Sequence, residues 1–254
     1  MDVIGVIPAR FYSTRFEGKV LAKILGKPMI QLVYEKAKQA RLLDDVIIAC
    51  DHELVAGAVR EFGAKVVFTA KAHPCGTDRI SEVVNPLDVK IVVNIQGDEP
   101  LIHPSMIDSV AEALLNNKDL NMATLMKRIE DSALINDPNV VKVVVDKNNF
   151  ALYFSRAAIP HFAFNSGVAK PVYFKHIGLY GYTKDFLFTY KNLPVSNLEK
   201  TERLEQLRVL EEGFRIKVIE TKFDTVGVDT PDDLIKVEEY LRKPACRLPD
   251  GSQG

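Results

Sequence analysis

The sequence contains no tryptophan and only three cysteines among its 254 residues. The three thiols, Cys50, Cys75 and Cys246, are far apart along the chain and odd in number. This pattern fits a reducing compartment better than a disulfide framework or a zinc site. We therefore expect a cytoplasmic protein.

Long apolar runs are also missing. No segment approaches the ~18 consecutive apolar residues that a membrane span needs. Arg10 interrupts the first apolar run well short of the length of a signal peptide. The sequence predicts neither a membrane span nor an export signal, and we expect no membrane partner.

An excess of charge of either sign is absent as well. Lysine and arginine total 33 and aspartate and glutamate 34, which gives a formal net charge of -1. Nucleic-acid-binding proteins usually carry a basic excess, so we expect no nucleic-acid partner. With 47% hydrophobic and 26% charged residues, the composition is that of a soluble globular protein able to bury a large core.

The residues after the first predicted strand fit neither the P-loop pattern nor the GxGxxG fingerprint. Instead, the apolar residues 3–7 lead into a loop that carries Arg10, Arg15 and Lys19. Open α/β sheets bind ligands at the carboxyl ends of their strands, and guanidinium forks with an ammonium suit a polyphosphate. A solvated basic loop is the alternative that this segment alone leaves open.

The first half of the chain alternates β-branched runs with amphipathic stretches. Such alternation is typical of βαβ units, which build a parallel sheet with right-handed crossovers. The expected strands span residues 3–7, 46–50, 66–68 and 91–95, and the expected helices span 28–41, 53–62, 78–84 and 104–116.

After residue 121 the pattern changes. The expected strands are 122–129, 140–145, 151–155 and 216–220, and the expected helices are 182–190, 202–211 and 231–241. We expect a single α/β domain over residues 1–243, with a Rossmann-like, mostly parallel sheet flanked by helices. A smaller β-containing lobe is expected at about 150–205, and a flexible tail over 244–254.

Two acidic residues stand at positions suited to a metal. Asp98 follows the strand expected at 91–95, so it lies at the same sheet edge as the cationic loop. A carboxylate there can hold Mg²⁺, which prefers hard oxygen ligands and often bridges to phosphates. Asp229 precedes the helix that begins near Pro231 and is a candidate second ligand. A turn cap at Asp98 and an N-cap at Asp229 are the structural alternatives.

The helix expected near residue 78 begins after a glycine-containing loop. Free backbone N–H groups at such a start can bind a nucleobase or phosphate oxygen. Thr77 and Arg79 are candidates for that site, although Thr77 can equally be a plain N-cap. Cys75 is expected to pack rather than react, because nothing nearby in the sequence activates its thiol.

Several longer motifs occur in one order between residue 3 and about residue 240. They are IPARxxSTRxxGKxL from residue 7, GKPMI from 26, GTDR from 76, NxQGDEP from 94, YFSRAxIP from 153, HIGxYGY from 176, LEQLR from 204 and GVDTP from 227. Together they resemble the sugar-nucleotide cytidylyltransferases, and within that family the branch that activates 3-deoxy-manno-octulosonate (Kdo).

The resemblance implies a nucleotidyltransferase fold and the reaction CTP + Kdo → CMP-Kdo + diphosphate. The anomeric hydroxyl of Kdo would attack the α-phosphate in line with the departing diphosphate, with Mg²⁺ as cofactor. This step would activate Kdo for lipopolysaccharide synthesis. A homodimer built through residues 157–200 is also implied.

The resemblance further assigns roles to residues. Arg10 and Lys19 would hold the triphosphate with help from Arg15, and Asp98 and Asp229 would bind Mg²⁺. The implied catalytic residues are Arg10, Lys19, Asp98 and Asp229; the implied nucleotide pocket adds Pro8, Ala9, Thr77, Arg79 and Gln96; the implied octulosonate contacts are Arg156, His176, Tyr180, Glu205 and Gln206.

Two departures and several alternatives accompany this assignment. The family usually has serine where Cys75 stands, and the tail from Pro244 matches no assigned segment. His176, Tyr180, Arg156 and Glu205 each also suit an ordinary packing or surface role. A cytidylyltransferase for another acidic sugar such as sialic acid, or a non-catalytic nucleotide-binding regulator, are the alternative functions.

Overall fold

The computed structural model describes residues 1–12, 16–73, 75–163 and 171–242, so Arg15 and the predicted tail over 244–254 lie outside the described residues. The strands are β1 (Val3–Ala9), β2 (Lys23–Ile24), β3 (Lys27–Pro28), β4 (Asp45–Cys50), β5 (Lys65–Phe68), β6 (Ile91–Asn94), β7 (Met122–Arg128), β8 (Lys142–Val145), β9 (Ala151–Ser155), β10 (Phe174–Thr183) and β11 (Lys217–Glu220). The helices are α1 (Met29–Ala37), α2 (Glu53–Glu61), α3 (Gly76–Val84), α4 (Pro104–Leu115), α5 (Lys184–Asn192), α6 (Asn197–Glu202), α7 (Leu207–Glu211) and α8 (Pro231–Arg242), with 3₁₀ turns η1 (Lys19–Leu21) and η2 (Ser132–Ile135).

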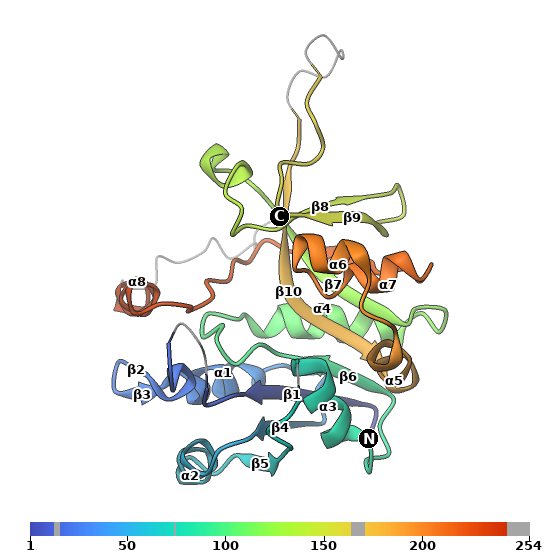
Figure 1. The fold of residues 1–254 in the computed structure, drawn as a ribbon. Helices are drawn as coiled ribbons and strands as arrows, with labels where there is room; N and C mark the ends of the chain where they lie inside the picture. The colour runs from blue at the N-terminus through green and yellow to red at the C-terminus, as the bar shows by residue number, and fades with distance from the viewer. Residues whose placement is uncertain (13–15, 74, 164–170, 243–254) are drawn as a thin grey trace, which may run out of the picture.

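The main sheet has the strand order β11-β7-β10-β6-β1-β4-β5 (Figure 1). Strand β1 pairs in parallel with β4 and β6, β4 with β5, and β11 with β7. Strand β10 runs antiparallel to both of its neighbours in this order, β6 and β7. The mostly parallel α/β sheet flanked by helices that the sequence predicts is therefore confirmed.

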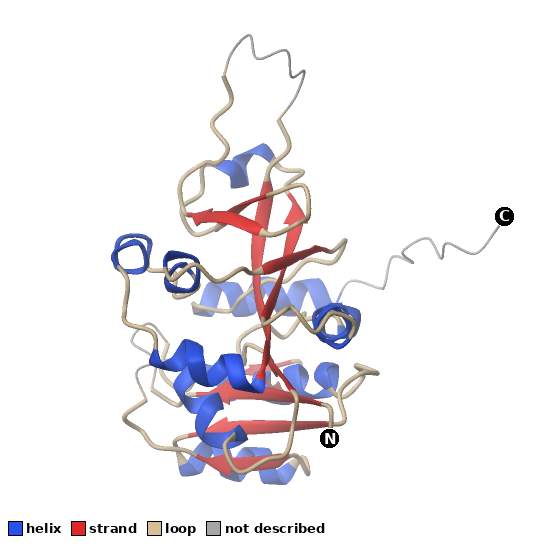
Figure 2. Ribbon diagram, turned by 90° about the vertical axis from the view of Figure 1, so that its right-hand side faces the viewer, coloured by secondary structure: helices blue, strands red, loops and turns tan. Residues whose placement is uncertain are grey.

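The continuous apolar character of β1 follows from burial on both faces. Val3 and Ile7 pack into the core that contains residues of α1, α2 and α4. Ile4 and Val6 point the other way, into the core that contains residues of α3, α5 and α7. Figure 2 shows helices on both sides of the strands. The carboxyl end of β1 is thus held rigidly between two cores.

Strand β10 is the major element that the sequence pattern does not predict. The helix expected over 182–190 is wrong at its start, because the strand continues to Thr183 and helix α5 begins at Lys184. The Thr183 hydroxyl accepts a hydrogen bond from the Phe186 N–H at 3.3 Å. A Cβ added to Gly181 would lie 2.5 Å from Val110 Cγ1, so glycine there lets α4 pack directly on the strand. The extended conformation of this segment depends on its pairing with strands far away in the sequence, and local periodicity does not reveal such pairing.

The single helix expected over 202–211 is also wrong. Arg203 adopts a left-handed backbone conformation with φ 55°, which ends α6, and a new short helix, α7, begins at Leu207. Between them Leu204 and Gln206 are buried. The break therefore turns side chains inward that a continuous helix would distribute around its surface.

The β8–β9 hairpin is attached to the main sheet through pairing of β8 with β10. It lies beyond the parallel strands, and the long strand β10 runs between the two parts (Figures 1 and 2). The division into one domain over 1–243 with a lobe at 150–205 stays a prediction. Among the described residues, no helix is both long enough and apolar enough to cross a membrane.

Candidate active site

Lys19 brings the two predicted metal-binding carboxylates together. Its Nζ donates hydrogen bonds to Asp98 Oδ2 at 2.7 Å and to Asp229 Oδ1 at 3.0 Å. The three residues come from η1, from the loop after β6 and from the segment before α8. We call this group the charged rim. The structure thus places two carboxylates, separated by more than a hundred residues in the sequence, around one cation.

Backbone contacts bring Asp229 to this position. The Val228 N–H donates to the Asp98 carbonyl at 2.9 Å, and the buried Val228 side chain packs beside Ile24 and Met29. Thr230 and Asp233 form a reciprocal cap at the start of α8, in which each backbone N–H donates to the side chain of the other. The side chain of Asp229 contacts Lys19, and the Thr230 hydroxyl accepts a cap hydrogen bond from the Asp233 N–H.

In the charged rim, the positive Lys19 ammonium contacts two negative carboxylates. Burial lowers the pKa of Lys19, but the adjacent Asp98 and Asp229 carboxylates raise it by more, and the net pKa is above the ordinary value. The ammonium therefore stays charged at neutral pH. Burial and the nearby Asp98 raise the pKa of Glu99 to about 8, so that neighbouring carboxyl group is largely protonated at neutral pH.

The donor set of the charged rim fits Mg²⁺. Two carboxylates offer the hard oxygens that Mg²⁺ prefers, and Mg²⁺ is commonly held by one or two carboxylates together with substrate phosphates. In the described part of the chain, no group of three or more His, Cys, Asp or Glu side chains is placed to form a metal cage.

Arg10 and Arg79 occupy the space behind the end of β1. The Arg79 side chain is fully buried, donates to Asp51 Oδ2 at 2.8 Å and also contacts the Thr69 hydroxyl. Asp51 Oδ1 accepts from the Phe11 N–H at 3.2 Å, so this ion pair anchors the start of the cationic loop. Arg10 Nη2 is buried and has no hydrogen-bond partner within the described residues, which leaves it available to an anion.

The remaining residues of the predicted nucleotide pocket lie where β1, β6 and α3 come close together. Pro8 and Ala9 end β1. A Cβ on Gly97 would lie 2.8 Å from the Pro8 carbonyl oxygen, so glycine permits this close approach. Helix α3 begins at Gly76 with Cys75 at the N-cap position, which corrects the N-cap alternative for Thr77.

A cavity of about 190 Å³ adjoins these segments. Five of the predicted site residues line it: Thr77, Gln96, Tyr180, Glu205 and Gln206. The rest of its lining is Gly76, Asn94, Tyr182, Tyr190, Arg203 and Leu204. We call this space the polar cavity. It joins residues predicted for the nucleotide with residues predicted for the sugar acid.

Glu205 lies at the exposed edge of the polar cavity. Its pKa is raised, mainly because the surrounding protein limits its hydration; Arg208 opposes this, and Glu199 and Asp78 add to it. Tyr180 lines the cavity, and desolvation raises its pKa as well. The Tyr180 hydroxyl and the Glu205 carboxyl group can therefore both form hydrogen bonds with a polyhydroxylated ligand.

His176 lies behind Tyr180 and is not among the described lining residues of the polar cavity. Its Nε2 is 2.9 Å from the Thr124 hydroxyl, and its ring centroid is 5.4 Å from that of Tyr180. Burial lowers the pKa of His176 to about 3, so the imidazole is neutral. The geometry gives His176 a supporting position against Tyr180.

Arg156 is likewise outside the described lining of the polar cavity. Its Nε donates to the Glu202 carbonyl and its Nη1 to the Pro138 carbonyl, each at 2.9 Å. The guanidinium thus links the segment after β9 to the end of α6. The octulosonate contact that the family resemblance implies for Arg156 stays a prediction.

The comparisons with known proteins agree with these features. The cytidylyltransferase family model matches residues 4–219. A 3-deoxy-manno-octulosonate cytidylyltransferase of Solibacter usitatus is 53% identical over 94% of this chain and 94% of its own length. The chain belongs to the 3-deoxy-manno-octulosonate cytidylyltransferase family. The member from Geobacter metallireducens is 49% identical over 96% of this chain and 99% of its own length.

A solved structure has the same fold as this member of the 3-deoxy-manno-octulosonate cytidylyltransferase family. It is CMP:2-keto-3-deoxy-manno-octonic acid synthetase complexed with CTP, which matches with a TM-score of 0.89 and 41% identity over 95% of this chain and 98% of that chain.

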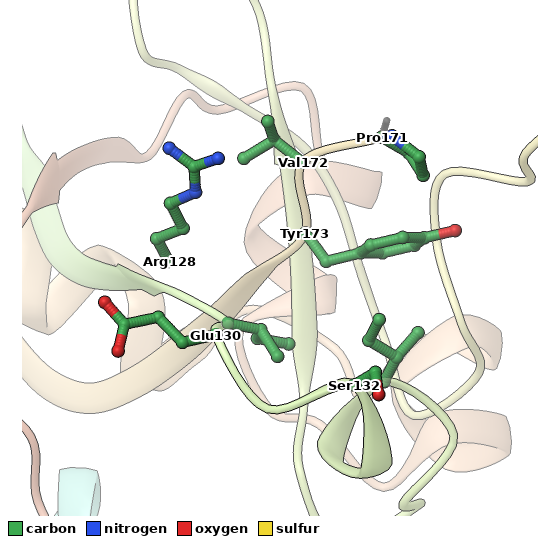
Figure 3. Close-up of a pocket in the computed structure, with 8 residues that line it drawn as sticks. Arg128, Glu130, Ser132, Pro171, Val172 and Tyr173 are labelled. Carbon is green, nitrogen blue, oxygen red and sulfur yellow. The ribbon is translucent and has the colours of Figure 1, made fainter. Parts of the chain in front are cut away.

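A second cavity, of about 370 Å³, lies where β7 ends and β10 begins. Figure 3 shows Arg128 and Glu130 on one side of it and the Tyr173 ring on the other. Among its described lining residues there is none of those that the resemblance to cytidylyltransferases assigns to a site.

Sequence reasoning missed several residues of the polar cavity, namely Asn94, Tyr182, Tyr190 and Arg203. A signal existed for Asn94, because a polar residue ends the otherwise apolar strand β6 at the edge where α/β sheets bind ligands. The three others come from β10, α5 and the turn after α6, where the element boundaries expected from the sequence are wrong.

Proposed function

We propose that this protein transfers CMP from CTP to Kdo with release of diphosphate. The observation that carries the proposal is the charged rim of Lys19, Asp98 and Asp229 beside the polar cavity, in a chain of this family. The rim supplies an ammonium and two carboxylates for a nucleoside triphosphate that carries Mg²⁺, and the cavity supplies mostly uncharged hydrogen-bonding groups for a sugar acid.

The nucleotide is assigned to the segments after β1 and β6. Arg10 and Lys19 would bind the triphosphate, together with Arg15, whose role stays a prediction from the sequence. Pro8, Ala9, Thr77 and Gln96 would surround the cytidine. Arg79 would contribute by holding Asp51 and, through it, the Phe11 backbone at the start of the loop.

Asp98 and Asp229 would hold Mg²⁺. When bound, the ion neutralises phosphate charge and favours ionisation of the attacking hydroxyl. The protein's own residues position the two reactants. The anomeric oxygen of Kdo forms a bond to the α-phosphorus while the bond from that phosphorus to diphosphate breaks, and alignment of these atoms supplies much of the rate enhancement.

The sugar acid is assigned to the polar cavity. Tyr180, Glu205 and Gln206 line it and would contact the hydroxyl groups. His176 would position the Tyr180 ring. Arg156 donates to backbone carbonyls through Nε and Nη1 and would bind the carboxylate through its other N–H donors; its assignment rests on the family resemblance.

Release of diphosphate from CTP and Mg²⁺ tests the proposal when it is measured with Kdo, with sialic acid and without an acceptor. We expect diphosphate release when Kdo is the acceptor, and no release with sialic acid or without an acceptor. Release with sialic acid and not Kdo would assign the protein to another acidic sugar, and no release with either acid would favour the non-catalytic regulator. ATP in place of CTP serves as the nucleotide control.

We also propose a cytoplasmic homodimer formed through residues 157–200. The thiol content supports the compartment, and the family resemblance supports the dimer. Light scattering coupled to gel filtration tests the dimer directly, because a monomer mass of 28.4 kDa at micromolar concentration would contradict it.

A further inference from the structure

Two buried amide side chains in the polar cavity have unsatisfied polar atoms. Asn94 and Gln206 are each 4% exposed, and both line the cavity. Asn94 Oδ1 and Gln206 Nε2 have no hydrogen-bond partner within the described part of the chain. Buried polar atoms without a partner are rare in folded proteins, and each calls for an explanation such as a bound ligand.

The position of Asn94 is fixed by two strands. It is the last residue of β6 and lies directly opposite Tyr180 on β10, so both side chains are on the same face of the sheet. The Tyr182 hydroxyl shares a hydrogen bond with the Asn94 side chain. Exchanging the amide oxygen and nitrogen of Asn94 would satisfy one atom and leave the other without a partner.

The chemistry of the surroundings favours a hydroxyl group as the missing partner. Three tyrosines, two glutamines, a threonine and Asn94 make most of the lining uncharged and polar. Phosphates are better served by Arg10 and Lys19 outside this lining. A hydroxyl can donate to an amide oxygen and accept from an amide N–H, which matches the unsatisfied pair.

We propose that Asn94 is a specificity-determining residue that binds a hydroxyl group of the sugar acid, together with Gln206. The proposal rests on the proposed function and extends it to a residue outside the set predicted from the sequence. Its consequence is selectivity. A site built to hydrogen-bond a hydroxyl rejects an analogue that lacks it, because the buried amide then stays unpaired.

The test is steady-state kinetics of wild type and Asn94→Ala with Kdo and with its 4-, 5-, 7- and 8-deoxy analogues. We expect Asn94→Ala to raise the KM for Kdo about 10- to 100-fold, with the KM for CTP unchanged. We also expect that wild type uses one of the deoxy analogues poorly, and that the variant uses this analogue and Kdo equally well. Asn121→Ala, at an exposed asparagine, is the matched control.

The outcomes separate this proposal from the proposed function. Wild type that releases diphosphate with Kdo, combined with an unchanged Kdo KM or unchanged discrimination in Asn94→Ala, overturns the role of Asn94 alone. An equal rise in the KM for CTP assigns Asn94 to the nucleotide and also overturns it. Wild type that is inactive with Kdo overturns both.

A second variant guards against misfolding. If Asn94→Ala fails to fold, as judged by circular dichroism and calorimetric CTP binding, Asn94→Ser is measured in its place. Selection against every deoxy analogue equally by wild type would also contradict the proposal, because a single amide pair recognises one or two hydroxyl positions.

Discussion

The charged rim and the polar cavity differ in how their polar groups are paired, although Gln96, which lines the cavity, is only two residues from Asp98 at the rim. At the rim, Lys19 is paired with Asp98 and Asp229. In the cavity, Asn94 and Gln206 each have an atom with no partner in the described residues. An unpaired, partly buried charge is far more costly than an unpaired amide, so the Lys19 ammonium is paired with its neighbours while the two amides each keep an open atom.

The difference indicates two modes of binding. A ligand at the rim must exchange partners, because the ammonium and the carboxylates already satisfy one another. A ligand in the cavity adds hydrogen bonds to two atoms, Asn94 Oδ1 and Gln206 Nε2, that have none within the described residues. Binding at the rim is therefore expected to depend on salt, whereas recognition in the cavity depends on shape and hydrogen bonding.

The largest effect is expected from Asp98→Asn, which breaks the charged rim. The substitution keeps the shape and removes a charged ligand, so turnover should fall on the order of 100- to 1000-fold. Diphosphate release measures the loss, and circular dichroism checks the fold. Asp88→Asn, at an exposed aspartate away from the rim, is the control and should keep its activity. Near-normal turnover in Asp98→Asn would exclude a role for this carboxylate.

Arg156→Ala tests whether the acceptor site extends beyond the polar cavity. If Arg156 binds the substrate carboxylate, the KM for Kdo should rise about tenfold in this variant while the KM for CTP changes little. Arg60→Ala is the control, because Arg60 pairs with Glu53 on the surface. Equal changes in both KM values would place Arg156 outside the acceptor site and confine it to holding the end of α6.

Acid should affect the support of the polar cavity through His176. Burial lowers the pKa of this histidine to about 3, whereas an unfolded histidine titrates near 6.5. Below about pH 6.5 the unfolded chain binds a proton that the folded protein does not, so stability falls as the pH decreases from there toward 3. Urea unfolding at pH 7.5, 6.5 and 5.5 measures the slope.

His176→Gln should flatten this acid dependence while lowering stability at pH 7.5. His161→Gln is the control at an exposed histidine and should keep the wild-type slope. Identical slopes for wild type and His176→Gln would show that another group dominates the acid response.

The smallest effect is expected from Cys75→Ser, next to the polar cavity. Cys75 is the N-cap residue of α3 and makes no side-chain cap hydrogen bond. Serine is a preferred N-cap, so the substitution should stabilise the protein by about 0.5–1 kcal/mol without reducing activity. Cys50→Ser, in the core, should instead destabilise it. Loss of activity in Cys75→Ser would give the thiol a functional role.

The elements with strong local signals were predictable. The apolar runs of β1, β4 and β6 fall within the expected strands, because strands buried on both faces are apolar throughout. Strand β10 was not predictable, since its residues are partly polar and its place between β6 and β7 depends on pairing with strands that are more than forty residues away in the sequence. The break at Arg203 was hidden by a run of good helix formers.

The candidate site likewise has features that the sequence predicted and features that it did not. The motifs predicted which loops carry Lys19, Asp98 and Asp229, because strand ends and capping patterns are local. They did not predict that Arg79 is enclosed by Asp51 and Thr69, or that Arg156 spans two backbone carbonyls. Those partners come from segments far away in the chain, and hydrogen-bond choice among many candidates follows only from their positions in space.

The amino-acid order by itself determined the class of sheet, the identity of the chemically competent side chains and the family to which the chain belongs. Tertiary structure alone decided that Lys19 bridges two carboxylates and that Asn94 lines a cavity with its Oδ1 unpaired among the described residues. The physical reason is that periodicity and caps act over a few residues, whereas charge pairing and burial depend on distances between segments that only folding brings together.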